Sequence, residues 1–383
     1  MAIVIQPYRQ EHESAVQEFN RRLQRSGDPN LVFSQSCVPR WLPPANDNPV
    51  WNEFYVAVDS SRPELSVRGA YGLKQEALFV RGKGVQRIAC YHHPLSEGIV
   101  DRAFTSVGML LARDALARQP YLYALGMGGS ETPIARMLKA LGFSLAAIPF
   151  YFRVVHPAKF LREMQALREK SWRAMLMDVA AVSGTGWLAI KTAQAVASSH
   201  GEALNFAVEE VGEFSDWADE LWNRAKENVS AATVRDARTL RLLYPANIGN
   251  NIATKIATTR HLRVSRDGSA IGWAVVGIRR KDAKYGTMRV GSIVDCWAMP
   301  ENAIAVIRAA TQALENDRAD LIVSNQSHRI WCSALEKSGF LKGPTNFVFA
   351  ASKKLTELLR PIEENRESLH ITRADGDGLP VNF

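Results

Sequence analysis

Three places in the sequence combine residue types that could take part in acid–base chemistry. The first is His92 and His93, which end the strand-like run Lys83 to His93. An imidazole titrates near neutral pH and is the commonest general base. Because neighbouring strand residues point to opposite faces, we expect only one of the two rings to face a given cleft. The alternative is a buried, hydrogen-bonded histidine beside an exposed one.

Asp295 and His328 are the other two candidates for catalysis. Asp295 lies inside the apolar run Ile293 to Trp297, where a carboxylate must be either paired or poised for chemistry. It could equally accept backbone N–H groups at a strand bulge. His328 follows the strand-like segment Asp320 to Ser324 and could instead cap the helix after it. The sequence leaves both interpretations open for each residue.

A glycine cluster at Gly126, Gly128 and Gly129 raises the question of a phosphate-binding loop. A dinucleotide fingerprint would require a third glycine where this chain has Glu131, and an acidic strand end about 20 residues further on, where this chain has an apolar run. We therefore expect no dinucleotide site. The glycines are more consistent with a strand that splays from its neighbour and approaches a ligand.

No metal site is expected from the sequence. The four cysteines are far apart and lack the spacing of zinc ligands: Cys37, Cys90, Cys296 and Cys332. The acidic turn Asp375-Gly376-Asp377 begins like a calcium loop but lacks the bidentate glutamate of the twelfth position. The cysteines are interpreted as reduced thiols.

The first residues carry no basic lead and only a short apolar run, so a cytoplasmic location is expected.

Length and charge favour a globular protein of two domains without a nucleic-acid partner. The chain has 383 residues, 46% of them hydrophobic, and 47 Lys and Arg against 39 Asp and Glu, a net charge of +8. Its densest basic cluster, Arg279-Arg280-Lys281, lies beside Asp282 and is interpreted as a hairpin tip. No transmembrane segment is expected, because charges and glycines interrupt the most apolar stretch, residues 172–197; it could at most contact a membrane surface.

The elements that must position the candidate residues follow one order, which occurs twice. In the first half we expect a strand at Ile3 to Ile5, a helix at Ser14 to Leu23, three antiparallel-type strands, a helix, a strand, a helix and a last strand. The second half repeats this order from Phe206 to Ala351. Three local matches support a duplication: Phe19-Asn20-Arg21 with Trp222-Asn223-Arg224, Cys90-Tyr91 with Cys296-Trp297, and Leu138 to Phe143 with Leu335 to Phe340.

The ends of the two copies carry a resemblance to a known family. Arg136 to Phe143 and Ala334 to Phe340 each resemble the helix-to-strand ending of the GNAT acetyltransferase superfamily, in which a helix closes at a glycine and an aromatic residue begins the last strand. The resemblance implies an α/β protein with two tandem GNAT-like domains, each a mixed, mostly antiparallel sheet flanked by helices. The domains are expected at 1–157 and 205–355, with a helical linker at 158–204 and a C-terminal helix and tail at 356–383.

The resemblance also implies an acyl-CoA-dependent N-acyltransferase acting on an amine-bearing small molecule or amino sugar. Its acyl-CoA, such as acetyl-CoA, would lie against the loop after the fourth strand, which implies these cofactor-binding residues: Leu95, Ser96, Gly98, Ile99 and Val100. The second copy has no glycine in that loop, and Pro300 lacks a donor, so the active site is expected in the first domain. The family's usual acid, a tyrosine, is replaced by Leu138 and Leu335.

Two other functions remain open. One is a catalytically degenerate GNAT-like module for binding or assembly, which the missing tyrosine and the altered phosphate loops favour. The other is a transferase that takes aminoacyl groups from tRNA. The absence of a basic run or a coiled-coil insertion in the sequence argues against this second alternative.

Overall fold

The computed structural model describes residues 2–163 apart from Asn30, Asn46 and Arg62, then Leu188, Thr192 and Gln194, then 205–246, 257–280, 286–360 and 367–376. It divides into two compact units. The first comprises Met1–Ala147, Asn346–Glu363 and Asp375–Asp377, and the second comprises Ile148–Thr345, Glu364–Ala374 and Gly378–Phe383.

The first unit is built on a mixed sheet with the strand order β1-β2-β3-β4-β5-β15-β6. All neighbours are antiparallel except β4 and β5. The strands are β1 (Ile3–Pro7), β2 (Trp51–Asp59), β3 (Val67–Val80), β4 (Gly84–Ser96), β5 (Leu122–Gly126), β15 (Val348–Ala351) and β6 (Ser144–Ala147), and the helices are α1 (Glu13–Leu23), α2 (Thr105–Arg118), α3 (Pro133–Ala140) and α13 (Lys353–Leu358).

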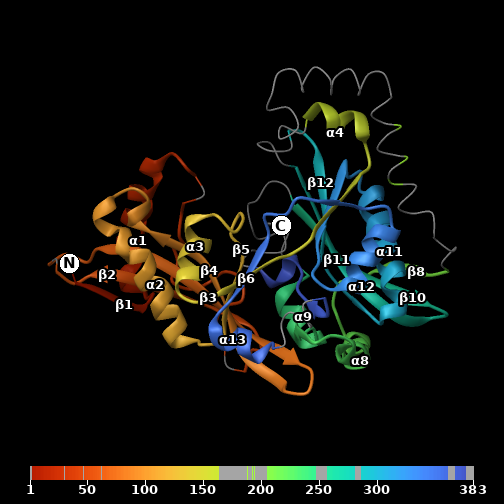
Figure 1. Cartoon of the computed structure of the whole chain (residues 1–383), viewed down its shortest axis with the longest axis horizontal. Coiled ribbons are helices and arrows are strands. Elements are labelled where there is room, and N and C mark those ends of the chain that lie inside the picture. Colours follow the sequence, from red (N-terminus) through yellow and green to blue (C-terminus); the bar gives the residue numbers. More distant parts are fainter. Residues whose placement is uncertain are drawn as a thin grey trace. The chain divides into compact units, whose positions relative to one another are not determined.

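Helices cover both faces of this sheet (Figure 1). The apolar stripe of α1, with Val16, Phe19 and Leu23, packs on Val56 and Ala70. On the opposite face α2 and α3 bury Val107, Leu111 and Leu138 against Tyr71, Leu73 and Ala124. The sheet therefore has two apolar faces, as its nearly continuous apolar strands predict.

The second unit has the same architecture, with the strand order β14-β7-β13-β12-β11-β10-β8; among these described strands, the parallel neighbours are β12 and β13. Its strands are β8 (Ala207–Glu210), β10 (Ala257–Arg266), β11 (Ser269–Arg280), β12 (Arg289–Ala298), β13 (Leu321–Asn325), β7 (Phe150–Val154) and β14 (Leu341–Gly343). Its helices are α4 (Pro157–Glu163), α8 (Asp216–Ala225), α9 (Ala237–Leu243), α11 (Ala303–Asn316) and α12 (Arg329–Lys337). In Figure 1, α11 and α12 lie against β11 and β12.

Each unit completes its sheet with a strand from the other half of the sequence. β15 lies between β5 and β6 in the first unit, and β7 lies between β13 and β14 in the second. The compact units therefore differ from the contiguous ranges 1–157 and 205–355, because the last strand of each half is exchanged. Most of the expected linker 158–204 lies outside the described residues; α4 occupies its beginning.

The expected elements are present, with three differences. Residues 233–243 were expected to be helical, but Ala231–Thr233 form the short strand β9 and the helix begins only after Asp236, whose side chain accepts a hydrogen bond from the Thr239 N–H. Strands β6 and β14 were not anticipated. The match of Cys90 with Cys296 was wrong: Cys90 is the last β4 residue paired with β5, whereas Cys296 lies beyond the last pair of β12 with β13.

The two Gly-Phe endings adopt the geometry that the sequence predicts. Gly142 and Gly339 follow α3 and α12 with φ of 85° and 79°, in the left-handed region that favours glycine after a helix. Phe143 and Phe340 are buried immediately after them. This pattern accounts for the closing turn of both helices.

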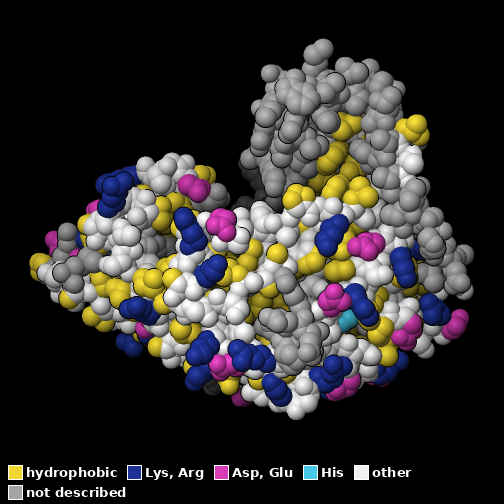
Figure 2. Space-filling view, viewed as in Figure 1, with side chains coloured by type: hydrophobic (Ala, Val, Ile, Leu, Met, Phe, Trp, Pro, Cys, Tyr) yellow, Lys and Arg dark blue, Asp and Glu magenta, His cyan; other side chains and the backbone are white. Residues whose placement is uncertain are grey.

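Surface features bear on the expected partners. On the face shown in Figure 2, Lys and Arg side chains are interspersed with Asp and Glu over the described part of the molecule. In the described ranges no helix is long and apolar enough to cross a membrane. Residues 172–197 and Lys281 to Lys284 lie almost wholly outside those ranges.

Candidate functional site

In the first unit β4 and β5 run side by side only briefly. They pair at Ala89↔Leu122 and Cys90↔Tyr123, after which β5 continues beside β15. In the described part of this unit, the rest of β4, Tyr91–Ser96, is paired only with β3. We call the point beyond Cys90 and Tyr123, where the two strands part, the first fork. In the second unit β12 and β13 part after the pair Ile293↔Ser324, and this point is called the second fork.

A bulge in β4 places both candidate histidines at the first fork. The register between β3 and β4 shifts between Ala70 and Gly72, and His93 has φ of 47°. The His93 ring lies 5.8 Å from Phe33, and the His92 ring 6.4 Å from Phe54, a ring that itself contacts Phe33. The bulge interrupts the alternation of side chains here, and His92 is buried while His93 is exposed.

The other strand of the first fork ends in an unusual turn. Gly126, Met127, Gly128 and Gly129 all have positive φ. Met127 and His93 are therefore non-glycine residues in a region that costs of order 1–3 kcal/mol and that persists mostly at functional sites. One lies on each side of the first fork. At the second fork, none of the described residues beyond the last strand pair has positive φ.

His92 is held in its neutral form. Its side chain packs directly over the α-carbon of Gly72, where a Cβ atom would lie 2.4 Å from the ring, so only glycine fits there. Only 7% of the residue is exposed, and among the described residues Nε2 has no hydrogen-bond partner. Burial, with the nearby charges of His93 and Lys74, lowers the pKa of His92 to about 3. Its conjugate acid is therefore not populated at neutral pH.

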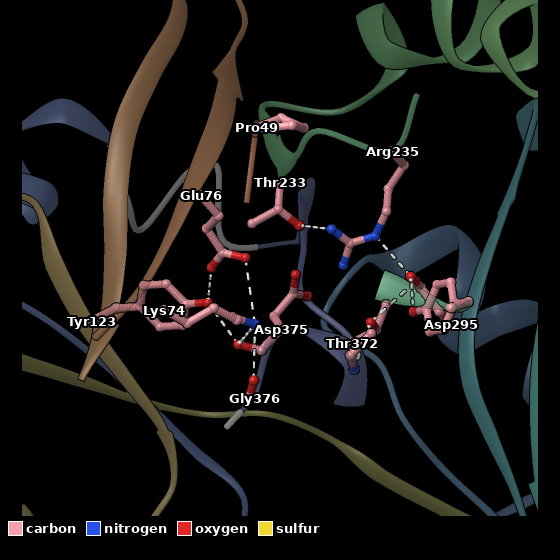
Figure 3. Close-up of polar contacts among 12 residues, drawn as sticks. Pro49, Lys74, Glu76, Tyr123, Thr233, Arg235, Asp295, Thr372, Asp375 and Gly376 are labelled. Carbon is pink, nitrogen blue, oxygen red and sulfur yellow. Dashed lines mark hydrogen bonds and ion pairs between the residues drawn. The ribbon is translucent and has the colours of Figure 1, made fainter. Parts of the chain in front are cut away.

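A buried polar cluster at the first fork was not anticipated from the sequence (Figure 3). It consists of Lys74 in β3 and Tyr123 in β5, both opposite Cys90, with Glu76 two residues along β3. Glu76 accepts a hydrogen bond from the Tyr123 hydroxyl and pairs with Lys74 at 3.4 Å. Tyr123 also donates to the carbonyl oxygen of Asp375, which Lys74 contacts as well. A Lys-x-Glu pattern in an apolar strand was the available signal.

The loop after β4 does not present its backbone donors in the expected way. The Gly98 N–H donates to the Ser96 hydroxyl, and the N–H groups of Val100 and Asp101 donate to the Glu97 carbonyl. Leu95 is buried and paired with Ala70 in β3. A Cβ atom on Gly98 would lie 2.8 Å from the Phe104 carbonyl oxygen. Glycine is thus required there for close packing of the loop on the start of α2.

Glu97 fixes this loop to the body of the first unit. Its buried carboxylate accepts hydrogen bonds from Arg22 at 2.8 Å and Arg68 at 2.9 Å. On the outer side of the loop lies a cavity of about 370 Å³, lined by Arg22, Arg25 and Ser26 after α1 and by Glu97, Ile99, Val100 and Asp101. Arginine side chains, rather than loop amides, are the phosphate-binding groups that this region offers.

Asp295 is held in the second unit by four donors. It is fully buried, and Arg235, which is 2% exposed, donates from Nε at 2.7 Å. The Tyr244 hydroxyl donates to the same oxygen at 2.7 Å, while the Cys296 N–H and the Thr372 hydroxyl donate to the other at 3.0 and 3.2 Å. Figure 3 shows Arg235 and Thr372 directed at this carboxylate. The surroundings are those of a structural ion pair beside a bulge.

The chain's own C-terminal segment, residues 367–374, occupies the second fork. Within it β16 (Leu369–His370) runs parallel to β9, and the Ser327 N–H, beyond the end of β13, donates to the Ile371 carbonyl at 3.1 Å. Thr372 reaches Asp295 of β12. The segment therefore contacts both diverging strands of the second unit.

His328 begins α12 as an N-cap. Its Nδ1 accepts a hydrogen bond from the Ile330 N–H at 3.3 Å. Burial and the neighbouring His370 lower the pKa of His328 to about 4. The capping role was the alternative that the sequence left open. In the described part of the chain, no group of three or more His, Cys, Asp or Glu side chains could hold a metal ion.

No family model matches the sequence, and a comparison with curated proteins finds no match. Solved structures do match. A GCN5-related N-acetyltransferase from Anabaena variabilis shares 10% identity, with a TM-score of 0.53 over 91% of this chain and 72% of that one. Saccharomyces cerevisiae N-myristoyltransferase with bound myristoyl-CoA, a tandem GNAT fold, shares 10% identity, with a TM-score of 0.52 over 92% and 78%.

The chain has a tandem GNAT fold. The two GNAT copies separate the candidate residues: His92 and His93 lie at the first fork, and Asp295 and His328 lie in the second GNAT copy. Of the residues expected to contact acyl-CoA, Ile99 and Val100 line the cavity, Ser96 and Gly98 close the loop, and Leu95 belongs to the sheet.

Proposed function

We propose that the protein is an acyl-CoA-dependent N-acyltransferase with its reaction centre at the first fork. The supporting observation is the contrast between the two GNAT copies. The first fork carries a strained non-glycine residue on each diverging strand, His93 and Met127, whereas none of residues 294–299 and 325–328 at the second fork has positive φ. Strain of this kind is retained where a site must be preorganised.

The reaction expected at this place joins an amine to an acyl group. The amine nitrogen attacks the thioester carbonyl carbon, the C–N bond forms as the C–S bond breaks, and the proton lost by the amine is finally gained by the departing thiolate. We assign the base to His93, which is exposed at the bulge. With its pKa near 3, His92 is too weak a base to hold that proton.

The acyl donor would be acetyl-CoA or another acyl-CoA, and the acceptor an amine-bearing small molecule such as an amino sugar. The loop amides of Gly98, Val100 and Asp101 are already bonded within the loop, and Arg22 is bound to Glu97. The diphosphate of the donor would therefore be met by Arg25 at the adjoining cavity. No metal takes part in this proposal. The closed loop is also the observation that favours the second candidate function, a catalytically degenerate GNAT-like binding module.

Replacing His93 separates its two roles. In both His93→Asn and His93→Gly we expect N-acyl transfer to fall by about 10²–10⁴-fold, because the general base is lost. The free energy of unfolding of His93→Gly should also be higher than that of the wild-type chain, by up to about 1 kcal/mol, because glycine adopts a positive φ without strain. Turnover with a panel of acyl-CoAs and amines, together with chemical unfolding, measures both effects.

The outcomes distinguish the two candidate functions. Full activity in both His93 variants would remove His93 from the chemistry. If neither the wild-type chain nor a chain ended after Ala374 turns over any acyl-CoA with any amine, the enzyme is contradicted and the binding module is favoured.

A further inference from the structure

We propose that the Lys74 ammonium and the Tyr123 hydroxyl are the oxyanion donors of the first fork, and that the peptide Asp375–Gly376 occupies their binding place as a resident competitor. This inference rests on the proposed acyltransferase function. It assigns a catalytic role to two residues that belong neither to the loop after β4 nor to the histidine pair. It assigns a regulatory role to Asp375 and Gly376, which directly follow the C-terminal segment.

The position of these two residues follows from the strand register. Lys74 pairs with Cys90 across β3 and β4, and Cys90 pairs with Tyr123 across β4 and β5. Paired residues point to the same face of a sheet, so Lys74, Cys90 and Tyr123 lie in a row on one face, at the last pair before β4 and β5 part. His92, two residues after Cys90 in β4, shares this face, and the charge of Lys74 acts on its ring.

The geometry is that of a site for a carbonyl oxygen. The carbonyl oxygen of Asp375 accepts hydrogen bonds from Tyr123 Oη at 2.6 Å and from Lys74 Nζ at 3.1 Å. Two convergent donors at about 2.7–3.1 Å are what stabilises a tetrahedral oxyanion. Figure 3 shows both side chains directed at this peptide.

Both donors are preorganised and shielded from water. Lys74 is fully buried and Tyr123 is 2% exposed. Lys74 is also held by the Gly376 carbonyl at 2.8 Å and by Glu76. Burial and the Glu76 carboxylate raise the pKa of Tyr123 well above its usual value, so its hydroxyl keeps its proton. That single proton is shared between two acceptors, Glu76 and the carbonyl oxygen in the binding place, and shifts toward the second as negative charge develops there. Electrostatic stabilisation is strongest in such a dry, fixed site.

In the reaction, the thioester carbonyl oxygen would take the place of the Asp375 oxygen. As the amine adds, negative charge develops on that oxygen between Lys74 Nζ and Tyr123 Oη; as the C–S bond breaks, the charge passes to the thiolate. Neither donor loses its proton overall. The Asp375–Gly376 peptide must leave before the acyl group can enter, so the apparent affinity for the acyl group is the intrinsic affinity multiplied by the fraction of time that the place is free.

The test combines two point variants with a truncation. We expect Tyr123→Phe and Lys74→Met each to lower kcat by about 10²–10³-fold with little change in KM for acyl-CoA, because the donors act mainly on the transition state. Ending the chain after Ala374, at the last residue of that segment in the second unit, should lower KM for acyl-CoA by about tenfold while kcat is retained.

Matched controls exclude a purely structural effect. Tyr8→Phe removes another phenol that donates to a main-chain carbonyl, that of Gln35, and Lys83→Met removes an exposed lysine from the β3–β4 turn; neither should change kcat. Circular dichroism verifies that every variant is folded. If the truncated chain is unfolded, the kcat values of the two point variants still test whether Lys74 and Tyr123 are the oxyanion donors.

Each outcome supports or overturns the inference. Variants of Tyr123 and Lys74 with wild-type kcat, in a chain that still depends on His93, would overturn it while leaving the acyltransferase in place. A truncation that raises KM would overturn the competitor role. An inactive full chain whose truncated form is active would support it, and no turnover in either form would overturn both the inference and the acyltransferase.

Discussion

Replacing Asp295 with alanine should reduce the free energy of unfolding by about 3–5 kcal/mol. The carboxylate is fully buried, and its removal takes the Asp295 charge away from the Arg235 guanidinium, which is 2% exposed. The hydroxyls of Tyr244 and Thr372 would lose an acceptor at the same time. Chemical unfolding of the wild-type and variant chains measures the difference.

A surface pair and a double variant serve as controls for Asp295. Glu209 and Arg263 form an ion pair at 3.8 Å with Glu209 largely exposed, so Glu209→Ala should cost less than about 1 kcal/mol. Combining Asp295→Ala with Arg235→Met should recover much of the loss, because the uncompensated buried charge is then gone. A loss of less than 1 kcal/mol in the single variant would show that the ion pair is not structural.

Lowering the pH should begin to destabilise the fold at a higher pH than the titration of carboxylates alone would. The folded pKa values of His92 and His328, about 3 and 4, lie below the usual histidine value of about 6.5. Between these limits the unfolded chain binds protons that the folded chain excludes, so stability falls as pH falls. Each group contributes a slope of about 1.4 kcal/mol per pH unit to the free energy of unfolding. At pH 5 the two slopes together are about 2.7 kcal/mol per pH unit. The slope is about half as large at pH 6.5 and vanishes above about pH 7.5, where both histidines are neutral in both states.

His328→Asn isolates one of these contributions. Asparagine keeps a side-chain oxygen that can cap α12 but does not titrate. Unfolding free energies measured between pH 5 and 6.5 should show an average slope lower by about 1 kcal/mol per pH unit than in the wild-type chain. An unchanged slope would mean that His328 is protonated in the folded state, contrary to its burial beside His370.

Much of the fold follows from local sequence. Strand alternation and helical stripes placed most elements, and the glycines after α3 and α12 marked both helix ends because a positive φ is needed there. The exchange of β7 and β15 could not be inferred in this way. Both strands are short and apolar, so either sheet could accept them by pattern alone. The bulge at His93 is likewise a register shift between strands, which the sequence of one strand does not encode.

The candidate site was likewise predicted only in part from the sequence. The sequence located His92 and His93 because two imidazoles at a strand end are conspicuous, but it gave no indication of the low pKa of His92, which depends on burial against Gly72. It missed Lys74, Glu76 and Tyr123 because their partners, the carbonyls of Asp375 and Gly376, lie at the far end of the chain. It left both catalysis and a structural role open for Asp295, whose four donors favour the structural role.

Hydrogen–deuterium exchange of the intact chain with and without a saturating acyl-CoA tests the location of the reaction centre most directly. We expect protection of β4 and the following loop, residues 91–104, and of residues 123–134 around the end of β5, with no change at 294–302 or 325–332 of the second unit. Protection confined to the second unit, or acyl-CoA binding that leaves both segments of the first fork unprotected, would contradict an active site in the first GNAT copy.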